Sequence, residues 1–239
     1  RRVSYRELPA PTALRDLAEC MWVNEGPRQA WVLPDGCMDL IEMNDAVLIA
    51  GPDTTAFLSD QHSPLATGIR FRPGALPRLL GVPAGELHNQ RVALDAVRPE
   101  LKGGSLMSRT ARLLGREPNR ETAPWRLAQL RHITQRFAGG ASVQYVADEI
   151  GWSTRTLQRQ CVAVYGYGPA TLRRVLRFRE AVRLLRSGHT VADTAAQVGY
   201  ADQSHLSRQV RELAGVPAGR LYSGAKRSIE VPSGSSTVA

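Results

Sequence analysis

The sequence predicts an α+β protein in which a small antiparallel β domain with helices precedes an all-α domain. Short strand patterns separated by turn residues fill the first third of the 239-residue chain, and one helical pattern occurs twice in the second half. Residues 1–119 hold 14 Lys/Arg and 14 Asp/Glu, whereas residues 120–239 hold 17 and 8, so the whole net charge of +9 lies in the second half. We therefore predict an N-terminal domain (1–117), a helical domain (118–227) and a flexible tail (228–239) rich in Ser, Gly and Thr.

The first domain begins with a predicted amphipathic helix, Thr12 to Val23, because apolar residues recur there at helical spacing. Turn residues then separate four predicted strands, which are residues 30–33, 38–43, 46–50 and 68–72. Several short strands at this spacing indicate a small antiparallel sheet or barrel. A longer helix is predicted from Arg98 to Leu114. Its Leu106/Leu113 and Met107/Leu114 pairs recur at seven residues, which fits either a dimerisation helix or packing against its own sheet.

Residues 141–169 and 190–217 carry the same pattern of apolar residues and glycines twice. Each copy predicts a helix, a turn containing Gly151 or Gly199, and a second helix. This is the helix-turn-helix arrangement that enters a DNA major groove. Ser153 and Asp202 stand where each second helix begins and are suitable N-terminal caps.

A polar linker (115–124) and a helix (125–137) precede the first copy, and a helix from Pro169 to Ser187 joins the two. Pro169 suits the first turn of that helix and Gly188 suits its end. A helix of about 19 residues is roughly 28 Å long. Major-groove faces one turn apart are separated by about 34 Å. A rigid helix of this length allows one monomer to read two successive grooves.

The polar face of each second helix contains the predicted DNA contacts, because the apolar residues between them are expected to face the core. Arg pairs with guanine and Gln with adenine, while hydroxyls and N–H groups at a helix start anchor phosphates. A basic half beside a neutral half is expected when only one half meets a polyanion. The predicted contacts to double-stranded DNA are Thr154, Arg155, Thr156, Gln158 and Arg159 in the first copy, and Gln203, Ser204, His205, Ser207, Arg208 and Arg211 in the second.

Residues 125–223 resemble the DNA-binding domain of the AraC/XylS family of bacterial transcription regulators. The resemblance rests on Val146-Ala147, Ile150-Gly151, Leu157-Gln158-Arg159, Gly166 and Pro169, then on Ala195-Ala196, Val198-Gly199-Tyr200, Gln203 to Arg208, Gly215-Val216-Pro217 and Tyr222. It implies a sequence-specific activator or repressor that binds promoter DNA, with RNA polymerase as a partner of an activator. By position, the family's base-reading sites fall on Arg155, Gln158 and Arg159, then on Ser204, His205 and Arg208. Gln160-Cys161 and Val210 depart from the family's larger apolar residues, which predicts thinner packing there.

Residues 12–95 resemble the sensor-like N-terminal domain of one subgroup of these regulators, through Leu33 to Ile41, Gly51-Pro52 and Arg70 to Gly74. The resemblance implies a compact cupin-like β domain that binds a small-molecule effector or a partner and shifts the population of DNA-competent arrangements. Aromatic walls with a few polar groups make a binding site, although each such residue also fits packing, a turn or a surface charge. The predicted effector-binding residues are Trp22, Trp31, Asp39, His62, Arg70 and Arg72.

The remaining composition narrows the class of protein. The three cysteines form no CxxC pair, and no apolar stretch approaches a membrane span of about 18 residues. These features, and the lack of a secretory segment, predict a cytoplasmic, nucleoid-associated protein. A homodimer is a further option that the sequence leaves open. His62 and His88 lie 26 residues apart without a His-x-His cluster, so no metal or other cofactor is expected. Cys37 with His62 lacks an orienting partner, so we predict no enzyme.

Two alternative functions stay open at this point. The first is a cupin-like ligand-binding or enzymatic protein with a non-specific basic helical appendage. The second is an architectural DNA binder without sequence preference. The dependence of DNA affinity on salt and on base sequence distinguishes them from a sequence-specific regulator.

Overall fold

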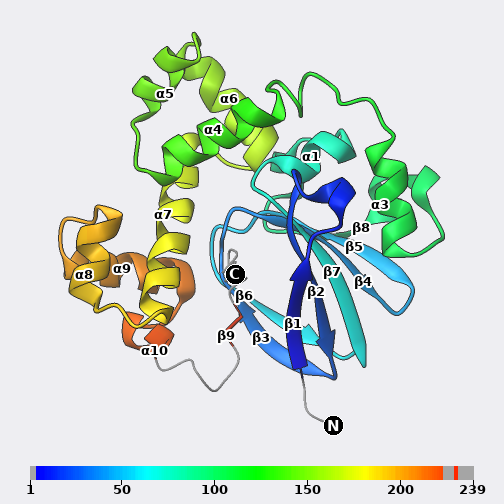
Figure 1. The fold of residues 1–239 in the computed structure, drawn as a ribbon, viewed down its shortest axis with the longest axis horizontal. Coiled ribbons are helices and arrows are strands. Elements are labelled where there is room, and N and C mark those ends of the chain that lie inside the picture. Colours follow the sequence, from blue (N-terminus) through cyan, green and yellow to red (C-terminus); the bar gives the residue numbers. More distant parts are fainter. Residues whose placement is uncertain (1–3, 223–228, 231–239) are drawn as a thin grey trace.

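The computed structural model describes residues 4–222 and 229–230, in which a β domain lies beside two helical units joined by one long helix (Figure 1). A six-stranded sheet has the order β1-β2-β7-β4-β5-β8, and a three-stranded sheet has the order β6-β3-β9. Neighbouring strands pair antiparallel, except for β3 and β9, which run parallel. The strands are β1 (Ser4–Pro9), β2 (Ala18–Glu25), β3 (Arg28–Val32), β4 (Met38–Met43), β5 (Ala46–Ala50), β6 (Phe57–Gln61), β7 (Leu65–Phe71), β8 (Arg91–Ala93) and β9 (Ile229–Glu230).

Side chains alternate between the two faces of the larger sheet along its central strands, and both faces are covered there. Leu40 of β4 and Ile69 of β7 face the main hydrophobic core, whereas Asp39 and Arg70 face a cavity lined by both sheets. Three short helices and three 3₁₀ turns cover the core. They are α1 (Ala75–Leu80), α2 (Leu94–Val97), α3 (Leu106–Leu114), η1 (Thr12–Leu14), η2 (Ala84–Leu87) and η3 (Pro99–Leu101).

The second half of the chain is helical and has two further hydrophobic cores, one for each helix-turn-helix unit. Helix α7 runs between the units and contributes apolar side chains to both cores (Figure 1). The helices are α4 (Leu127–Ala138), α5 (Val143–Glu149), α6 (Thr154–Tyr165), α7 (Pro169–Arg186), α8 (Val191–Val198), α9 (Gln203–Ala214) and α10 (Ala218–Tyr222).

The β domain packs directly against α7. Leu33, at the end of β3, is buried in the core of the second unit. Arg179 in the middle of α7 forms an ion pair of 2.7 Å with Glu19 of β2, and both side chains are largely buried. The segment Pro34-Asp35-Gly36, between β3 and β4, also contacts the helical part, because a Cβ atom at Gly36 would lie 3.3 Å from Leu176 of α7.

The structure confirms the α+β class, the two helix-turn-helix units and the connecting helix. The predicted helix from Thr12 to Val23 is wrong, because Thr12–Leu14 is a 3₁₀ turn and Ala18–Glu25 is strand β2. Strand β2 pairs with both β1 and β7, and this long-range pairing outweighs the local helical spacing. Strands β1, β6 and β8 were not predicted.

The helix predicted from Arg98 begins only at Leu106, since Gly103 and Gly104 both have positive φ angles, 77° and 88°. Leu106 and Leu113 are buried against the main core, so packing on the protein's own sheet accounts for this pair. The predicted tail lies outside the described residues, apart from Ile229–Glu230, which form β9. The domain boundary at residue 117 stays a prediction.

Candidate nucleic-acid interface

The first helix-turn-helix unit consists of α5 and α6. The Ser153 hydroxyl accepts the backbone N–H of Thr156 at 3.1 Å and so caps α6, as the sequence predicted. Leu157, Cys161 and Val164 are buried beneath the helix. The predicted contacts on its opposite face are exposed at Thr154, Arg155, Gln158 and Arg159 and half-buried at Thr156.

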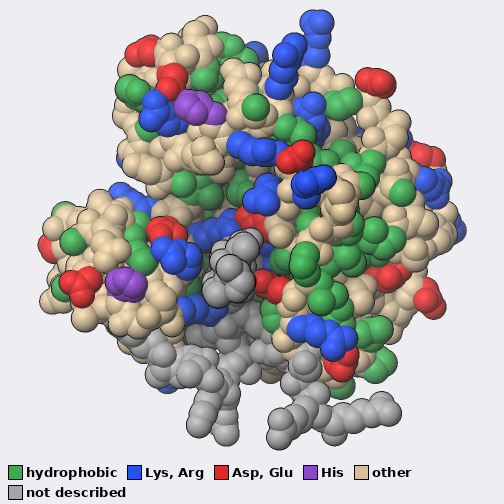
Figure 2. Space-filling view, viewed as in Figure 1, with side chains coloured by type: hydrophobic (Ala, Val, Ile, Leu, Met, Phe, Trp, Pro, Cys, Tyr) green, Lys and Arg blue, Asp and Glu red, His purple; other side chains and the backbone are tan. Residues whose placement is uncertain are grey.

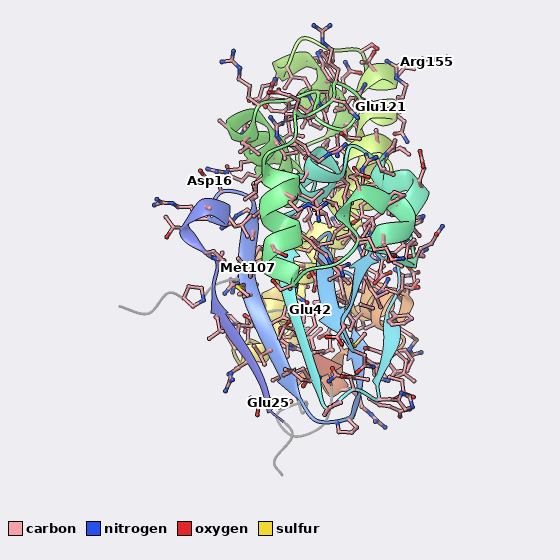
Figure 3. The ribbon with its side chains drawn as sticks, turned by 90° about the vertical axis from the view of Figure 1, so that its right-hand side faces the viewer. Asp16, Glu25, Glu42, Met107, Glu121 and Arg155 are labelled. Atoms are coloured by element: carbon pink, nitrogen blue, oxygen red, sulfur yellow. The ribbon has the colours of Figure 1, made fainter. Side chains whose placement is uncertain are left out.

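Two of these side chains have local neighbours. The Thr156 hydroxyl lies 2.9 Å from that of Ser153, so it takes part in the cap. The Gln158 amide lies against the backbone of Gly168, where an added Cβ would be 2.2 Å from Nε2. Figure 3 shows Arg155 at the outer edge of the first unit, away from the sheets. Arg155 and Arg159 are therefore the guanidinium groups most accessible to a duplex on this helix.

The second unit consists of α8 and α9. The Asp202 carboxylate accepts the N–H of His205 at 2.7 Å and caps α9. Gln203, Ser204, Arg208 and Arg211 are exposed, and His205 and Ser207 are half-buried. A shallow groove of about 460 Å³ runs along this face and is lined by Val191, Gln203, Ser204, Ser207, Arg208, Arg211 and residues 217–219.

His205 does not line that groove. Its ring packs edge-on against Tyr200 in the turn, with centroids 5.2 Å apart, and the Arg177 guanidinium of α7 lies 4.3 Å from the Tyr200 ring. In the first unit the corresponding turn residue, Trp152, packs against Trp125 at 5.4 Å. An aromatic side chain thus fixes each turn, and His205 is tied to this packing. Sequence reasoning missed the contribution of Arg177.

Helix α7 lies between the first unit, which contains α6, and the second unit, which contains α9. It contains 18 residues, which corresponds to about 27 Å. This is close to the one-turn spacing of successive major grooves, about 34 Å. Arg159 and Arg208 are both exposed, on α6 and α9 respectively. Each second helix therefore carries an exposed arginine, and α7 joins the two units.

The predicted effector residues divide into two groups. Trp22, Asp39 and Arg70 meet inside the β domain, where the Trp22 indole N–H and the Arg70 guanidinium donate to the same Asp39 oxygen at 2.9 and 3.1 Å. Trp22 lies across Gly68 of the neighbouring strand, where a Cβ atom would be 2.3 Å from the ring. Burial raises the pKa of Asp39 to about 6, and the nearby Arg70 partly opposes this shift.

The other three predicted effector residues lie elsewhere. Trp31 is 40% exposed on β3, and the His62 side chain is 83% exposed. Arg72 lines a separate cleft of about 820 Å³ between the β domain and helices α4 and α7. Figure 2 shows Lys and Arg side chains gathered around the hollow between the helical units and the β domain. The arginines that line the cleft are Arg72, Arg131, Arg179, Arg183 and Arg186.

The cavity between the two sheets, about 100 Å³, also contains polar residues that the sequence did not single out. Asn24 donates to Gln61 at 2.8 Å, and Asp35 lies 3.7 Å from Arg70. Among the described residues, the buried Arg70 Nε and Nη1 atoms and Asn24 Oδ1 have no hydrogen-bond partner. Asn24 was missed because most of its strand, up to Val23, was predicted as a helix. The alternating buried positions of β2 are the signal that would have found it.

The three cysteines all lie within the part of the chain that the structure describes. All three cysteines are buried and unpaired, and burial raises the pKa of Cys20 and of Cys161 to about 12. Within residues 4–222 and 229–230, no three His, Cys, Asp or Glu side chains form a group that could hold a metal ion. None of the described helices is long and apolar enough to cross a membrane.

Comparisons with known proteins give one family match in each half of the chain. Residues 146–222 match the family of helix-turn-helix domains, and residues 6–93 match a domain of unknown function, DUF6597. The C-terminal domain of AraT, a response regulator from Geobacillus stearothermophilus, is 23% identical over 43% of this chain and 85% of its own, with a TM-score of 0.37. ToxT from Vibrio cholerae is 10% identical over 92% of this chain and 98% of its own, with a TM-score of 0.47.

A further ToxT structure, bound to an unsaturated fatty acid, is 8% identical over 93% of this chain and 97% of its own, with a TM-score of 0.43. No curated protein matches the chain. The helix-turn-helix match includes both second helices and the connecting helix described above. Residues 146–222 therefore match a helix-turn-helix domain, and residues 6–93 match the DUF6597 domain.

Proposed function

We propose that this chain is a sequence-specific transcription regulator that reads promoter DNA with α6 and α9 and responds to a small molecule in its β domain. The observation that carries the proposal is the matched pair of second helices, each capped, packed on one face and polar on the other. Arg155 and Arg159 on α6, and Arg208 on α9, are the proposed base-reading arginines, since a guanidinium fork pairs with guanine.

Other polar residues on these helices have supporting roles in the proposal. Thr154, Gln203 and Ser204 lie in the first turns, where exposed N–H groups bind phosphate. Arg211 lies further along the groove of the second unit and adds positive charge. We assign DNA binding to residues 118–227 and effector response to residues 1–117, in a cytoplasmic protein associated with the nucleoid. An activator would also contact RNA polymerase.

The proposed effector site is the cavity between the two sheets. Arg70 is 6% exposed, and two of its nitrogen atoms have no hydrogen-bond partner among the described residues. The guanidinium is ion-paired with three carboxylates, but a buried N–H group without a hydrogen bond is costly. An acceptor oxygen of a bound molecule would supply the missing hydrogen bonds at Nε and Nη1. Asn24 Oδ1 in the same cavity needs a donor. The proposed effector is therefore a small polar molecule that offers both a donor and an acceptor.

The test is selection of duplexes from random-sequence DNA by the full-length protein, followed by affinity measurements in increasing salt. We expect a selected sequence with two sub-sites about one helical turn apart. Its affinity should fall by a factor of about 10³ or more between 50 and 200 mM salt, while the preference over unrelated DNA remains. A selected pool without a common sequence would support an architectural DNA binder and contradict the proposal.

A further inference from the structure

One short segment of the β domain contacts both second helices of the DNA-binding domain. This bridge segment, Gly51–Ala56, follows β5 and precedes β6. Its Pro52 packs against Gly166 at the end of α6, and the Ala56 N–H donates to the Leu213 carbonyl of α9 at 2.7 Å. We propose that the bridge segment positions α6 and α9 relative to one another, so that the β domain helps to determine which spacing of DNA sub-sites the protein accepts.

The contact with α6 is close and specific to glycine. Gly166 ends α6 with a φ angle of 87°, and an added Cβ there would lie 2.4 Å from Pro52 Cγ. The 3₁₀ turn η2 supports the same end of the helix, because a Cβ at Gly85 would lie 3.1 Å from Val162 Cγ1. The C-terminal end of α6 therefore lies in a notch formed by Pro52 and η2.

The contact with α9 is a backbone hydrogen bond. The last four carbonyl groups of a helix lack partners within the helix, and Leu213 lies in the last turn of α9. The Ala56 N–H supplies one of the missing donors, and the Ala56 side chain packs against the core of the second unit. A change in the position of Ala56 would therefore move the end of α9 or break this bond.

The bridge segment is itself held firmly in the β domain. Gly51 N–H donates to Gln90 at 2.9 Å, and Asn89 N–H donates to the Pro52 carbonyl at 3.1 Å. Asp53 receives two hydrogen bonds from the Arg91 guanidinium, at 3.0 and 2.6 Å. Only three residues lie between Pro52 and Ala56, which make the two helix contacts, so a shift of the segment acts on both helices together.

These contacts leave DNA reading unobstructed. They hold the C-terminal ends of α6 and α9, whereas the proposed reading residues Arg155, Arg159 and Arg208 lie nearer the N-terminal ends. Gly51, Asp53 and the following Phe57 also line the cavity between the sheets. The inference rests on the proposed DNA-reading function. The bridge segment both lines the cavity and contacts the two second helices, so it connects them physically.

The test compares two duplexes with the full-length protein: the sequence selected by the wild type, and the same sequence with one base pair inserted between the sub-sites. The insertion moves one sub-site by about 3.4 Å along the duplex and turns it by about 35°. We expect the wild type to bind the inserted duplex about tenfold or more weakly. Ala56→Pro removes the donor to Leu213 and should reduce this ratio to about threefold or less, with affinity for a single sub-site changed by less than about twofold.

Ala56→Gly is the matched control, because it keeps the N–H group and should keep the wild-type ratio. Pro52→Ala removes the ring contact with Gly166, keeps the Pro52 carbonyl, and carries the test if Ala56→Pro fails to fold. An unchanged ratio in folded Ala56→Pro or Pro52→Ala protein would overturn the inference, because α7 alone would then set the spacing. A merely destabilised variant would weaken binding to both duplexes by the same factor, so destabilisation alone cannot reduce the ratio. If the wild type selects no sequence at all, it is the proposed function that fails.

Discussion

Replacing Arg70 with Met should sharply destabilise the β domain at neutral pH. Arg70 lies among three carboxylates, with Asp39 at 3.1 Å and Asp35 and Glu7 each at 3.7 Å. Its side chain is 7% exposed, so water has little access to solvate the carboxylates that would remain. Removing one partner of a buried ion pair costs about 3–5 kcal/mol because the other charge remains unpaired. We expect a loss of this size at pH 7 in the free energy of unfolding of the full-length chain.

The loss should be smaller at pH 5. The pKa of Asp39 is raised by burial to about 6, above the value of about 3.9 in an unfolded chain. Protonation of Asp39 therefore favours the folded state, and this contribution is complete below about pH 4 and disappears as the pH rises through about 6. Without Arg70 the pKa rises further, and each additional unit of pKa makes the gain at low pH larger by about 1.4 kcal/mol.

Urea unfolding at pH 7 and pH 5, followed by tryptophan fluorescence, measures both effects. The control is Asp39→Asn combined with Arg70→Met, which removes the buried charge together with its partner and should be less destabilised at pH 7 than Arg70→Met alone. The reasoning would be refuted if Arg70→Met lost the same free energy at both pH values, or if the double variant were no more stable than the single one.

Three further outcomes are expected. Arg208→Ala should cost about 1–3 kcal/mol on the selected duplex and relax base choice at one position, whereas Arg183→Ala removes an equal charge from the cleft face of α7 and should leave base choice unchanged in the same binding titrations. Asp202→Ala should lower the free energy of unfolding by about 1 kcal/mol, read from thermal unfolding, because it removes the cap of α9; no measurable change would show that the cap contributes nothing. Arg179→Met should cost about 3–5 kcal/mol in urea unfolding by leaving Glu19 buried without its partner, and adding Glu19→Gln should restore part of it, unless the two residues are energetically independent.

Local rules predicted the helical half well because most of its determinants lie close together in sequence. The caps Ser153 and Asp202 and the proline at the start of α7 stand where the sequence placed them. The strands β4 and β5 also have the predicted bounds. The segment around β2 failed, since its apolar residues fit a helical stripe equally well and only pairing with β1 and β7 selects the strand.

The predicted effector residues show the same limit of sequence-based prediction. Trp22, Asp39 and Arg70 meet because β2, β4 and β7 are neighbours and these residues share one face. Arg72 lies just beyond the end of β7 and faces the interdomain cleft instead. A sequence reveals which residue types can bind a ligand, but strand order decides which of them meet. The contacts of the bridge segment with both second helices were equally invisible, because they join residues that lie far apart in sequence.

The burial of Leu33 among side chains of α7, α9 and α10 has a consequence for how the chain matures. Ribosomal synthesis produces the β domain first, and the last helices emerge only afterwards. Leu33 has then already been synthesised, so the last helices can pack against it to complete the hydrophobic core of the second helix-turn-helix unit. A fragment restricted to the helical part would lack Leu33 and would have a cavity in the core of the second unit. Measurements of DNA affinity should therefore use the chain with its β domain.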